Sequence, residues 1–565
     1  MLRRLLVLPA LVLCLVLLTA QGAFAHATVV ATSPGDGQTV SSAPHQVSVT
    51  FDEPVALQFG ALRVFSPTGS RVDEGTPAHP TGHADEVAVN VPTGLGQGTY
   101  TVAWRVISAD SHPVQGAFTF SIGKASASTV NSSALNPTGS KTVGALYAVA
   151  RFVAYFAFAI LVGATVFLFA WWPNGARTKA VRILLASAWG GLFLATAGVL
   201  ALQGPYGAGF GIGRALDTGV LRTTLSTRLG EALSARLVLL ALAAALLAWL
   251  FTWLPDASRR ARSLAAAAGG LLTVGIAATW AVSGHADTGI QVALAVPVDV
   301  AHLCAMAVWL GGLTMLAAIV LRRGGHGTPG ERARMVRGFS PVALSCVIVL
   351  VGTGTYQSWR QVGSLSALTS TAYGRLLLFK LLGVAVLIGL GYLARSWIAR
   401  HREDRNPGTT DRAAISRLRR SVAGEVGVGI CVLALTAALV NAPPARTAHA
   451  ASAGPVSGSA AFDTGGPGGS GTVQVTVDPA QTGADTVHLY TLGPTGKQEQ
   501  VLQVQASFAL ASPSLGPLPV TLRTAGAGHL IGAASLPIAG TWRLAVTVRT
   551  DDVDETTVQI PVTIR

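Results

Sequence analysis

The chain has 565 residues, of which half are hydrophobic and only 12% are charged, and it carries a net charge of +14. This composition is too apolar for an ordinary soluble protein, and the length allows three or four domains. The four cysteines lie in apolar runs and form no CxxC motif, which excludes a disulfide framework and a cysteine-based metal motif.

The first 25 residues have the pattern of a secretory signal peptide. Arg3 and Arg4 precede the apolar run LLVLPALVLCLVLLTA, and Ala23-Phe24-Ala25 forms a small-x-small cleavage site. We therefore expect residues 1–25 to be removed and His26 to begin the mature chain. An uncleaved anchor helix is the alternative.

Residues 26–124 predict a small exported all-β domain. Short runs such as HQVSVTFDEPV, GTYTVAWRVIS and GAFTFSIG alternate apolar and polar residues, and Pro, Gly, Asp and Ser separate the runs. This pattern is typical of an antiparallel β-sandwich. A Ser/Thr/Asn-rich linker over 125–143 is expected to follow it.

Residues 144–442 predict a bundle of eight transmembrane helices. Each apolar segment is long enough to span a bilayer. The segments centre on 146–172, 181–202, 234–254, 263–284, 292–321, 339–358, 376–398 and 421–442.

Every second loop of this bundle is basic. Loops 173–182, 255–262, 322–337 and 395–420 together hold 19 Lys/Arg and five Asp/Glu. By the positive-inside rule these loops are cytoplasmic, so both flanking polar regions are expected on the extracytoplasmic side of the plasma (inner) membrane. The positive charge is thus a topology signal, and no nucleic-acid partner is expected.

The C-terminal part of the chain predicts a second exported domain. Residues 443–470 are rich in Pro, Gly, Ser and Ala and predict a linker. Alternation returns over 471–565, in segments such as TVQVTV and TWRLAVTVRT, and predicts a β-sandwich. The expected fold class is a multi-domain membrane protein, with exported β-sandwiches on both sides of an eight-helix bundle.

A mature N-terminal His26 offers two nitrogen ligands to a metal ion. Its α-amine has an ordinary pKa of about 7.7–8.0, so a metal displaces the proton at low cost, and the imidazole closes a chelate ring. Cu(II) favours tetragonal nitrogen and oxygen ligands. The segment ISADSHPV places Asp110 and His112 on one face of an extended chain, and FDEPV adds Glu53. Alone, Asp-Ser-His is usually a turn and Glu-Pro a surface corner, but together with His26 they predict a Cu(II) site.

These segments resemble the CopC family of periplasmic copper-binding proteins. The resemblance covers residues 26–124 and includes the His-Ala start, VTFDEPV and WRVISADSHPVQGAFTFSIG. It implies that His26, Asp110 and His112 bind Cu(II), with Glu53 as a further ligand.

The fifth apolar segment carries ionisable residues within the membrane. At 1.5 Å per residue, His302 lies about 15 Å beyond Val292, near the bilayer midplane. Asp299, His302 and Met306 share one helix face, and the thioether of Met306 suits Cu(I). His285 lies at the outer end of the preceding segment. Ionisable groups at such depth are usually functional, so these four residues predict a path for a metal ion.

A structural role is the alternative for these residues. Asp299 and His302 would then pair with each other or with Arg151 and brace the bundle. Lys380 would extend toward the membrane surface, where a long side chain places its charge in water.

The bundle resembles the CopD family of copper-resistance and copper-uptake membrane proteins, over roughly residues 144–442. The matching segments are SGHADT (283–288), DVAHLCAMAVWLGGL (299–313), GFSPVALSCVIVLVGTGTY (338–356) and YGRLLLFKLLGV (373–384). Fusions of CopC and CopD domains are linked to copper acquisition, so the resemblance implies copper handling at the membrane.

We therefore expect a copper transport protein that binds Cu(II) outside the membrane and moves copper inward, as Cu(I) in the membrane domain. The expected partners are copper ions and the lipid bilayer, with an exported copper chaperone or a reductase as further candidates. One alternative is copper resistance by extracytoplasmic sequestration without transport. A remote alternative is a copper monooxygenase-like enzyme, whereas the main expectation is a protein that is not an enzyme.

Overall fold

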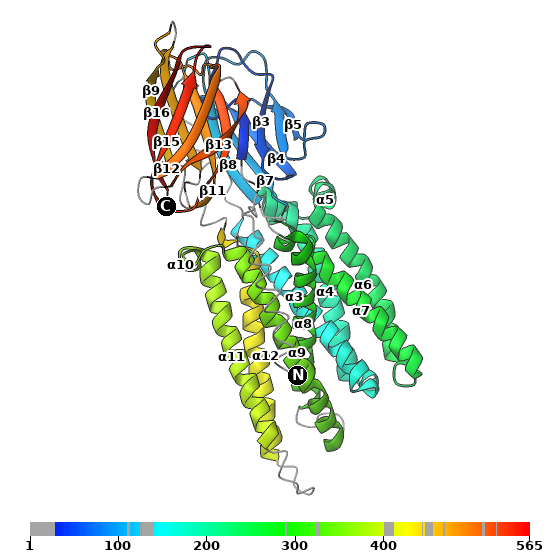
Figure 1. Ribbon diagram of the computed structural model, residues 1–565. Helices are drawn as coiled ribbons and strands as arrows, with labels where there is room; N and C mark the ends of the chain where they lie inside the picture. Colours follow the sequence, from blue (N-terminus) through cyan, green and yellow to red (C-terminus); the bar gives the residue numbers. More distant parts are fainter. Residues whose placement is uncertain are drawn as a thin grey trace. The chain divides into compact units, whose positions relative to one another are not determined.

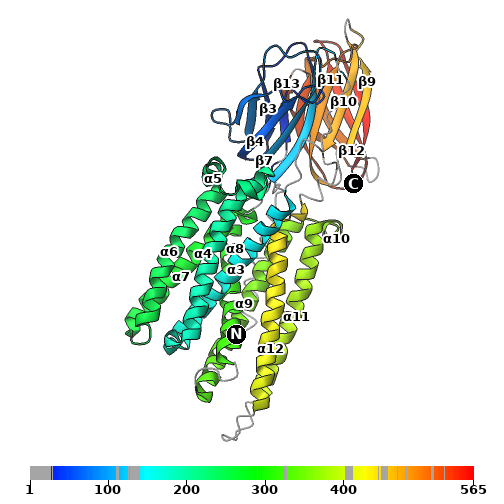
Figure 2. The ribbon, with the colours of Figure 1, turned by 180° about the vertical axis from the view of Figure 1, so that it is seen from behind.

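The computed structural model describes most of the chain in two compact units, one with the helices and one with the β-rich regions (Figures 1 and 2). The signal peptide, His26 and most of the first linker lie outside the described residues. The described residues are 27, 29–109, 113–124, 126, 140–288, 291–321, 328–400, 412–442, 444–446, 456–466, 469–478, 480, 482–510, 515–526 and 528–564.

The N-terminal region is a β-sandwich, as expected. Its two four-stranded sheets have the orders β1-β3-β6-β5 and β2-β8-β7-β4. Apolar residues of both sheets are buried between them, and Phe51 from one sheet meets Trp104 from the other edge to face at 5.3 Å. The strands are β1 (Val29–Ser33), β2 (Thr39–Val40), β3 (Gln46–Phe51), β4 (Ala56–Phe65), β5 (Glu74–Ala78), β6 (Glu86–Asn90), β7 (Gly98–Ile107) and β8 (Pro113–Ile122).

The central region is helical. Within the described residues, eight helices are long and apolar enough to cross a membrane, as expected from the sequence. They are α3 (Lys141–Ala170), α4 (Lys179–Ala208), α6 (Arg228–Trp253), α7 (Arg259–Ala281), α8 (Val292–Met315) with its continuation η4 (Leu316–Val320), α9 (Pro329–Val362), α11 (Ala372–Arg400) and α12 (Arg412–Val440). Shorter elements connect them: η1 (Pro173–Arg177), η2 (Ile212–Arg214), α5 (Thr218–Leu225), η3 (His285–Asp287) and α10 (Ala367–Ser370).

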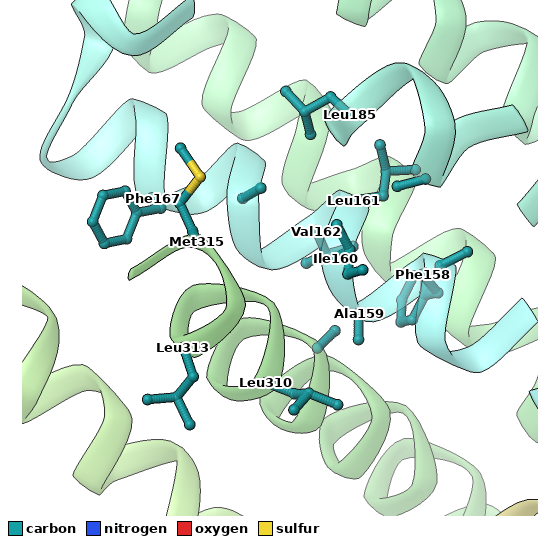
Figure 3. Close-up of a cluster of buried hydrophobic side chains, with 14 of the residues drawn as sticks. Phe158, Ala159, Ile160, Leu161, Val162, Phe167, Leu185, Leu310, Leu313 and Met315 are labelled. Atoms are coloured by element: carbon teal, nitrogen blue, oxygen red, sulfur yellow. The ribbon is translucent and has the colours of Figure 1, made fainter. Parts of the chain in front are cut away.

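Helices α3 and α8 pack backbone to backbone. A Cβ atom added to Gly311 would lie 1.9 Å from the carbonyl oxygen of Ala159, and one added to Gly163 would lie 2.5 Å from Cα of Gly311. Small residues permit such close approach between helices in a bilayer. Figure 3 shows the surrounding apolar side chains, with Phe158 on α3 and Leu310 on α8. This contact fixes the position of α8, the helix that carries Asp299 and His302.

A buried cation braces α6, α7 and α3. Arg236 on α6 is only 2% exposed, and its guanidinium lies 3.8 Å from the ring centroid of Trp280 on α7. Its Nε donates to Oγ1 of Thr279 at 2.8 Å. Trp280 in turn stacks on Tyr155 of α3 at 5.0 Å. The aromatic face thus stabilises a charge at a depth where charge is otherwise costly.

The C-terminal region is a single eight-stranded sheet of order β16-β15-β12-β13-β14-β11-β10-β9. Strands β16 and β9, at the two ends of this order, pack beside each other, so the sheet folds around a core that contains Trp542. The strands are β9 (Val456–Asp463), β10 (Ser470–Asp478), β11 (Gly483–Leu492), β12 (Gln503–Leu510), β13 (Leu515–Gly526), β14 (His529–Leu536), β15 (Gly540–Arg549) and β16 (Glu555–Ile564).

Strand β9 corrects the predicted linker over 443–470. Its Gly, Ser and Ala residues resemble a flexible connection, but it pairs along its whole length with β10. The small side chains have a packing reason, because a Cβ atom added to Gly458 would lie 2.6 Å from Cγ2 of Ile560 on β16. The C-terminal β-rich region therefore begins at Val456 rather than at residue 471.

Candidate functional site

Helix α9 presents a stripe of polar side chains toward α8. Thr353, Gln357 and Arg360 are spaced i, i+4, i+7 within VGTGTYQSWR, so they lie on one face of α9. Thr353 contacts His302, Gln357 contacts Asp299, and Arg360 contacts the turn that holds His285. The stripe therefore connects three of the four residues predicted to form the path.

The contact between His302 and Thr353 determines which nitrogen of the imidazole carries the proton. Nδ1 of His302 lies 2.8 Å from Oγ1 of Thr353. The Thr353 hydroxyl donates its single proton to the carbonyl of Val349 at 2.6 Å, so it accepts from Nδ1 of His302. In this tautomer Nε2 keeps its lone pair, which is the form of histidine that binds a metal ion.

Asp299 lies between an amide and a cation. Nε2 of Gln357 donates to Oδ1 of Asp299 at 2.8 Å. Lys380 on α11 lies close enough for its charge to act on both Asp299 and His302. Lys380 is half-buried and its charge interacts with that of Asp299, which favours a position inside the bundle over an extension toward the membrane surface.

His285 lies in η3, a single turn between α7 and α8, and is 8% exposed. The guanidinium of Arg360 donates to the backbone carbonyls of His285 and Thr288, and so holds this turn against α9. Asp287 forms an ion pair with Arg228 at 2.6 Å, which ties the same turn to α6. The turn is therefore fixed from both sides.

These contacts arrange the predicted residues in order. The three polar residues of the stripe on α9 lie over seven residues, from Thr353 to Arg360, which is about 10 Å along the helix axis. The order is the turn with His285, then Asp299, then His302. Met306 follows one helical turn further along α8 and packs, half-buried, against the apolar core of the bundle. Asp299 and His302 do not rely on Arg151, which donates instead to Oδ1 of Asn441 at 3.2 Å.

The predicted exported site falls mostly outside the described residues. His26, Asp110 and His112 are not among them. Glu53 is described and lies half-buried in the bend between β3 and β4. Within the described part of the chain, no group of three His, Cys, Asp or Glu side chains is arranged to hold a metal ion.

The sequence reasoning missed the supporting residues Thr353, Gln357 and Arg360. The sequence contains a pattern that could have identified them. Three polar side chains at helical spacing inside an apolar segment indicate a helix face that is not exposed to lipid. The tautomer of His302 could not be found in this way, since it depends on which carbonyl accepts the Thr353 proton.

Three domain families match this chain. The CopC domain matches residues 29–123, the Copper resistance protein D-like N-terminal domain matches 141–293, and Copper resistance protein D matches 333–439. The matches to the two copper resistance protein D families together cover most of the helical region, including η3 and the whole polar stripe of α9. Residues 294–332, which include Asp299 and His302, lie between the two matches.

Known proteins with copper functions are similar to the chain. It is 30% identical over 435 residues to the copper transport protein CutJ of Bacillus subtilis, and the alignment covers 74% of each protein. It is 34% identical over 110 residues to copper resistance protein C of Xanthomonas campestris pv. juglandis, covering 19% of this chain and 86% of that protein. The crystal structure of CopC from Methylosinus trichosporium OB3b matches at 26% identity with a TM-score of 0.16, over 17% of this chain and 93% of its own.

The extent of the similarity to CutJ decides the family, since it covers about three quarters of each protein at 30% identity. The eight helices are those of a multi-pass membrane protein. The chain therefore belongs to the family of copper transport and copper resistance proteins that includes CutJ, and it joins a CopC domain to a CopD domain in one polypeptide.

Proposed function

We propose that this protein binds Cu(II) at its exported CopC domain and moves copper inward across the membrane through its helical bundle. The main observation in support is the polar stripe of α9, which contacts the His285 turn, Asp299 and His302 in this order along the helix. A bundle that served only as an anchor would have no need for such costly groups in a continuous row.

The exported site would use His26, Asp110, His112 and Glu53. A terminal amine and two imidazoles supply nitrogen, and the carboxylates supply oxygen, which is the ligand set that Cu(II) prefers. This set requires removal of residues 1–25, because only a mature His26 has a free α-amine. Carboxylate ligands also favour binding over the oxygen chemistry of a monooxygenase, so the proposal is a carrier and not an enzyme.

The membrane path would carry Cu(I). His302 offers a neutral Nε2 and Met306 a thioether, both of which suit a monovalent soft ion. Asp299 balances the charge of Lys380 at rest and that of the ion during passage. Reduction of Cu(II) to Cu(I) consumes one electron, so an exported reductase or another external reductant is a required partner.

The distribution of basic residues supports the orientation. The loops after α3, α6, η4 and α11 hold the 19 Lys/Arg counted above, and this bias places them in the cytoplasm. Both β-rich regions then lie on the extracytoplasmic side, and His285 faces that side. An ion would meet His285 first and His302 later.

Intracellular copper in cells grown in copper-limited medium tests the proposal. Mass spectrometry would compare cells expressing the intact chain with cells expressing the His302→Ala, His26→Ala and His83→Ala variants. The intact chain and the His83→Ala control should raise intracellular copper, and the other two variants should abolish the rise. If copper increases only in the envelope fraction and His302→Ala has no effect, the protein is instead a surface store that confers resistance by sequestration.

A further inference from the structure

The C-terminal β-rich region contains a cluster of three rings, His488, Tyr490 and His529. Strands β11 and β14 are antiparallel neighbours, and Tyr490 pairs directly with His529. His488 and Tyr490 are two residues apart on β11, so they point to the same face. Val487 and Leu489 between and beside them are fully buried in the core. The three rings therefore share the face of the sheet that is turned away from the core.

The two imidazoles meet nitrogen to nitrogen. Nδ1 of His488 lies 3.2 Å from Nε2 of His529. The ring planes differ by 19°, and the centroids are 5.5 Å apart, further than the nitrogens, so the rings meet edge to edge. Tyr490 instead lies face to face on His529, with centroids 4.4 Å apart. The tyrosine ring thereby fixes the orientation of the buried His529.

The contact between the two rings is an N–H···N hydrogen bond. One nitrogen donates its proton, and the other must accept with its lone pair, so the accepting nitrogen carries no proton. Neutral imidazole is the form that binds metal ions.

We propose that His488 and His529 form a further copper site, separate from the two proposed above, which binds one Cu(I) ion between Nδ1 of His488 and Nε2 of His529. The ring that donates the shared proton takes its other tautomer, so its proton moves to the opposite nitrogen and both rings stay neutral. The ion then accepts one lone pair from each ring. No electron is transferred, and no proton is released.

The ligand set selects the ion. Within the described residues, no third His, Cys, Asp or Glu is grouped with the two imidazoles to hold a metal ion. Two neutral nitrogen ligands suit a monovalent ion that accepts two ligands. Zn(II) and Cu(II) prefer four. The charge of Asp478 on the neighbouring strand β10 acts on His488 and favours a cation at this place.

The spacing requires a small movement. A metal–imidazole bond is about 2 Å, so an ion on the line between the nitrogens needs a separation of about 4 Å. The pair must therefore open by about 0.8 Å from its proton-bridged distance, which a change in side-chain torsion provides without moving the strands. Because Tyr490 stacks on His529, most of this movement would fall to the half-buried His488.

Copper retention by the full-length protein in detergent tests the proposal. The starting protein would carry His112→Ala and His302→Ala, so that the two sites proposed above are disabled. Cu(I) would be supplied with ascorbate under argon, and the protein would then pass through a desalting column that contains a weak chelator. Mass spectrometry would measure the copper that stays bound to the protein. We expect one retained copper per chain, which the added pair His488→Asn and His529→Asn removes.

Two controls separate metal binding from folding. The matched pair His79→Asn and His83→Asn, in the N-terminal sandwich, should keep the retained copper. X-ray absorption at the copper edge uses the starting protein, in which His488 and His529 are unchanged. The spectrum should show two nitrogen ligands with the scattering pattern of imidazole. The proposal is overturned if the His488/His529 variant retains its copper, if sulfur ligands are seen, or if only zinc is retained.

Discussion

His302 donates a hydrogen bond from Nδ1 to the hydroxyl of Thr353 over 2.8 Å, and that hydroxyl donates in turn to the carbonyl of Val349. The chain of two hydrogen bonds leaves Nε2 of His302 as the only ring nitrogen able to bind an ion. A threonine on α9 thus decides which atom on α8 faces the proposed path.

Thr353→Val should weaken copper binding in the bundle. Partners that orient a metal-binding histidine typically contribute about 10- to 100-fold in metal affinity, because without them the ring turns and changes tautomer. Copper uptake by cells and copper retention by purified protein would both fall. The control is Thr355→Val, because the Thr355 hydroxyl donates only to the carbonyl of Val351 in the same helix. Equal losses in the two variants would contradict an orienting role for Thr353.

The architecture could be predicted from the sequence because it depends on periodicity. Alternation in segments such as HQVSVTFDEPV gave the N-terminal sandwich, and apolar length gave the eight spanning helices. Strand β9 was missed because its glycines and serines are selected by close packing against β16, which is a contact between distant segments. The local composition of a segment cannot predict such a contact.

The candidate site could be predicted only in part. Asp299 and His302 stand out because ionisable residues are rare in apolar helices. The extension of Lys380 toward the membrane surface was one alternative, because the sequence does not show that α11 brings its charge within reach of Asp299. The supporting contacts from α9 depend on the antiparallel register of α8 and α9, which neither helix specifies alone.

Lys380→Met should increase the amount of copper that the bundle retains. The ammonium acts on both Asp299 and His302, so a copper ion enters beside a like charge. Removal of that charge leaves Asp299 to balance the ion alone, and the bound ion should leave more slowly. Retention in detergent would rise severalfold, and Arg375→Met, on the exposed side of α11, should leave it unchanged. A loss of copper in Lys380→Met would show instead that the lysine is needed to assemble the site.

Gly311→Ala should destabilise the bundle by separating α3 from α8. The added Cβ atom would lie 1.9 Å from the carbonyl oxygen of Ala159, and backbone atoms cannot move aside as side chains do. Such overpacking costs roughly 1–3 kcal/mol. Thermal unfolding in detergent would show a lower midpoint than Gly190→Ala, where a Cβ atom meets nothing within 4 Å. Equal midpoints would mean that the helices are not in backbone contact.

His112→Ala should abolish Cu(II) binding to the exported domain, whereas Glu53→Gln should only weaken it. An imidazole is a principal ligand in the proposed set, but a carboxylate in a bend contributes one oxygen that water can replace. Electron paramagnetic resonance of Cu(II) added to the purified protein would show loss of nitrogen coupling in His112→Ala. The spectrum of Glu53→Gln would keep its nitrogen coupling. The opposite ranking would place the metal near the β3–β4 bend instead.

The C-terminal β-rich region should lose stability as the pH falls from about 6.5 to about 4. Burial holds the pKa of His529 at about 4 in the folded state, but in the unfolded chain the same imidazole has an ordinary pKa of about 6.5. Between these values the unfolded state binds a proton that the folded state excludes, so the stabilisation is complete above pH 6.5 and declines below it. The thermal midpoint would be measured on the full-length protein in detergent at pH 7.5, 5.5 and 4.5, because Asp36 of the N-terminal sandwich also acts on His488.

The His529→Asn variant isolates this contribution. Asp478, whose pKa is raised by burial, acts in the opposite direction at the lower end of this pH range, but it is present in both proteins and cancels in the comparison. The midpoint of the variant should therefore fall less than that of the unmodified protein between pH 6.5 and pH 4. Parallel curves for the two proteins would mean that His529 already binds its proton in the folded state, and that the two imidazoles do not share a single proton at neutral pH.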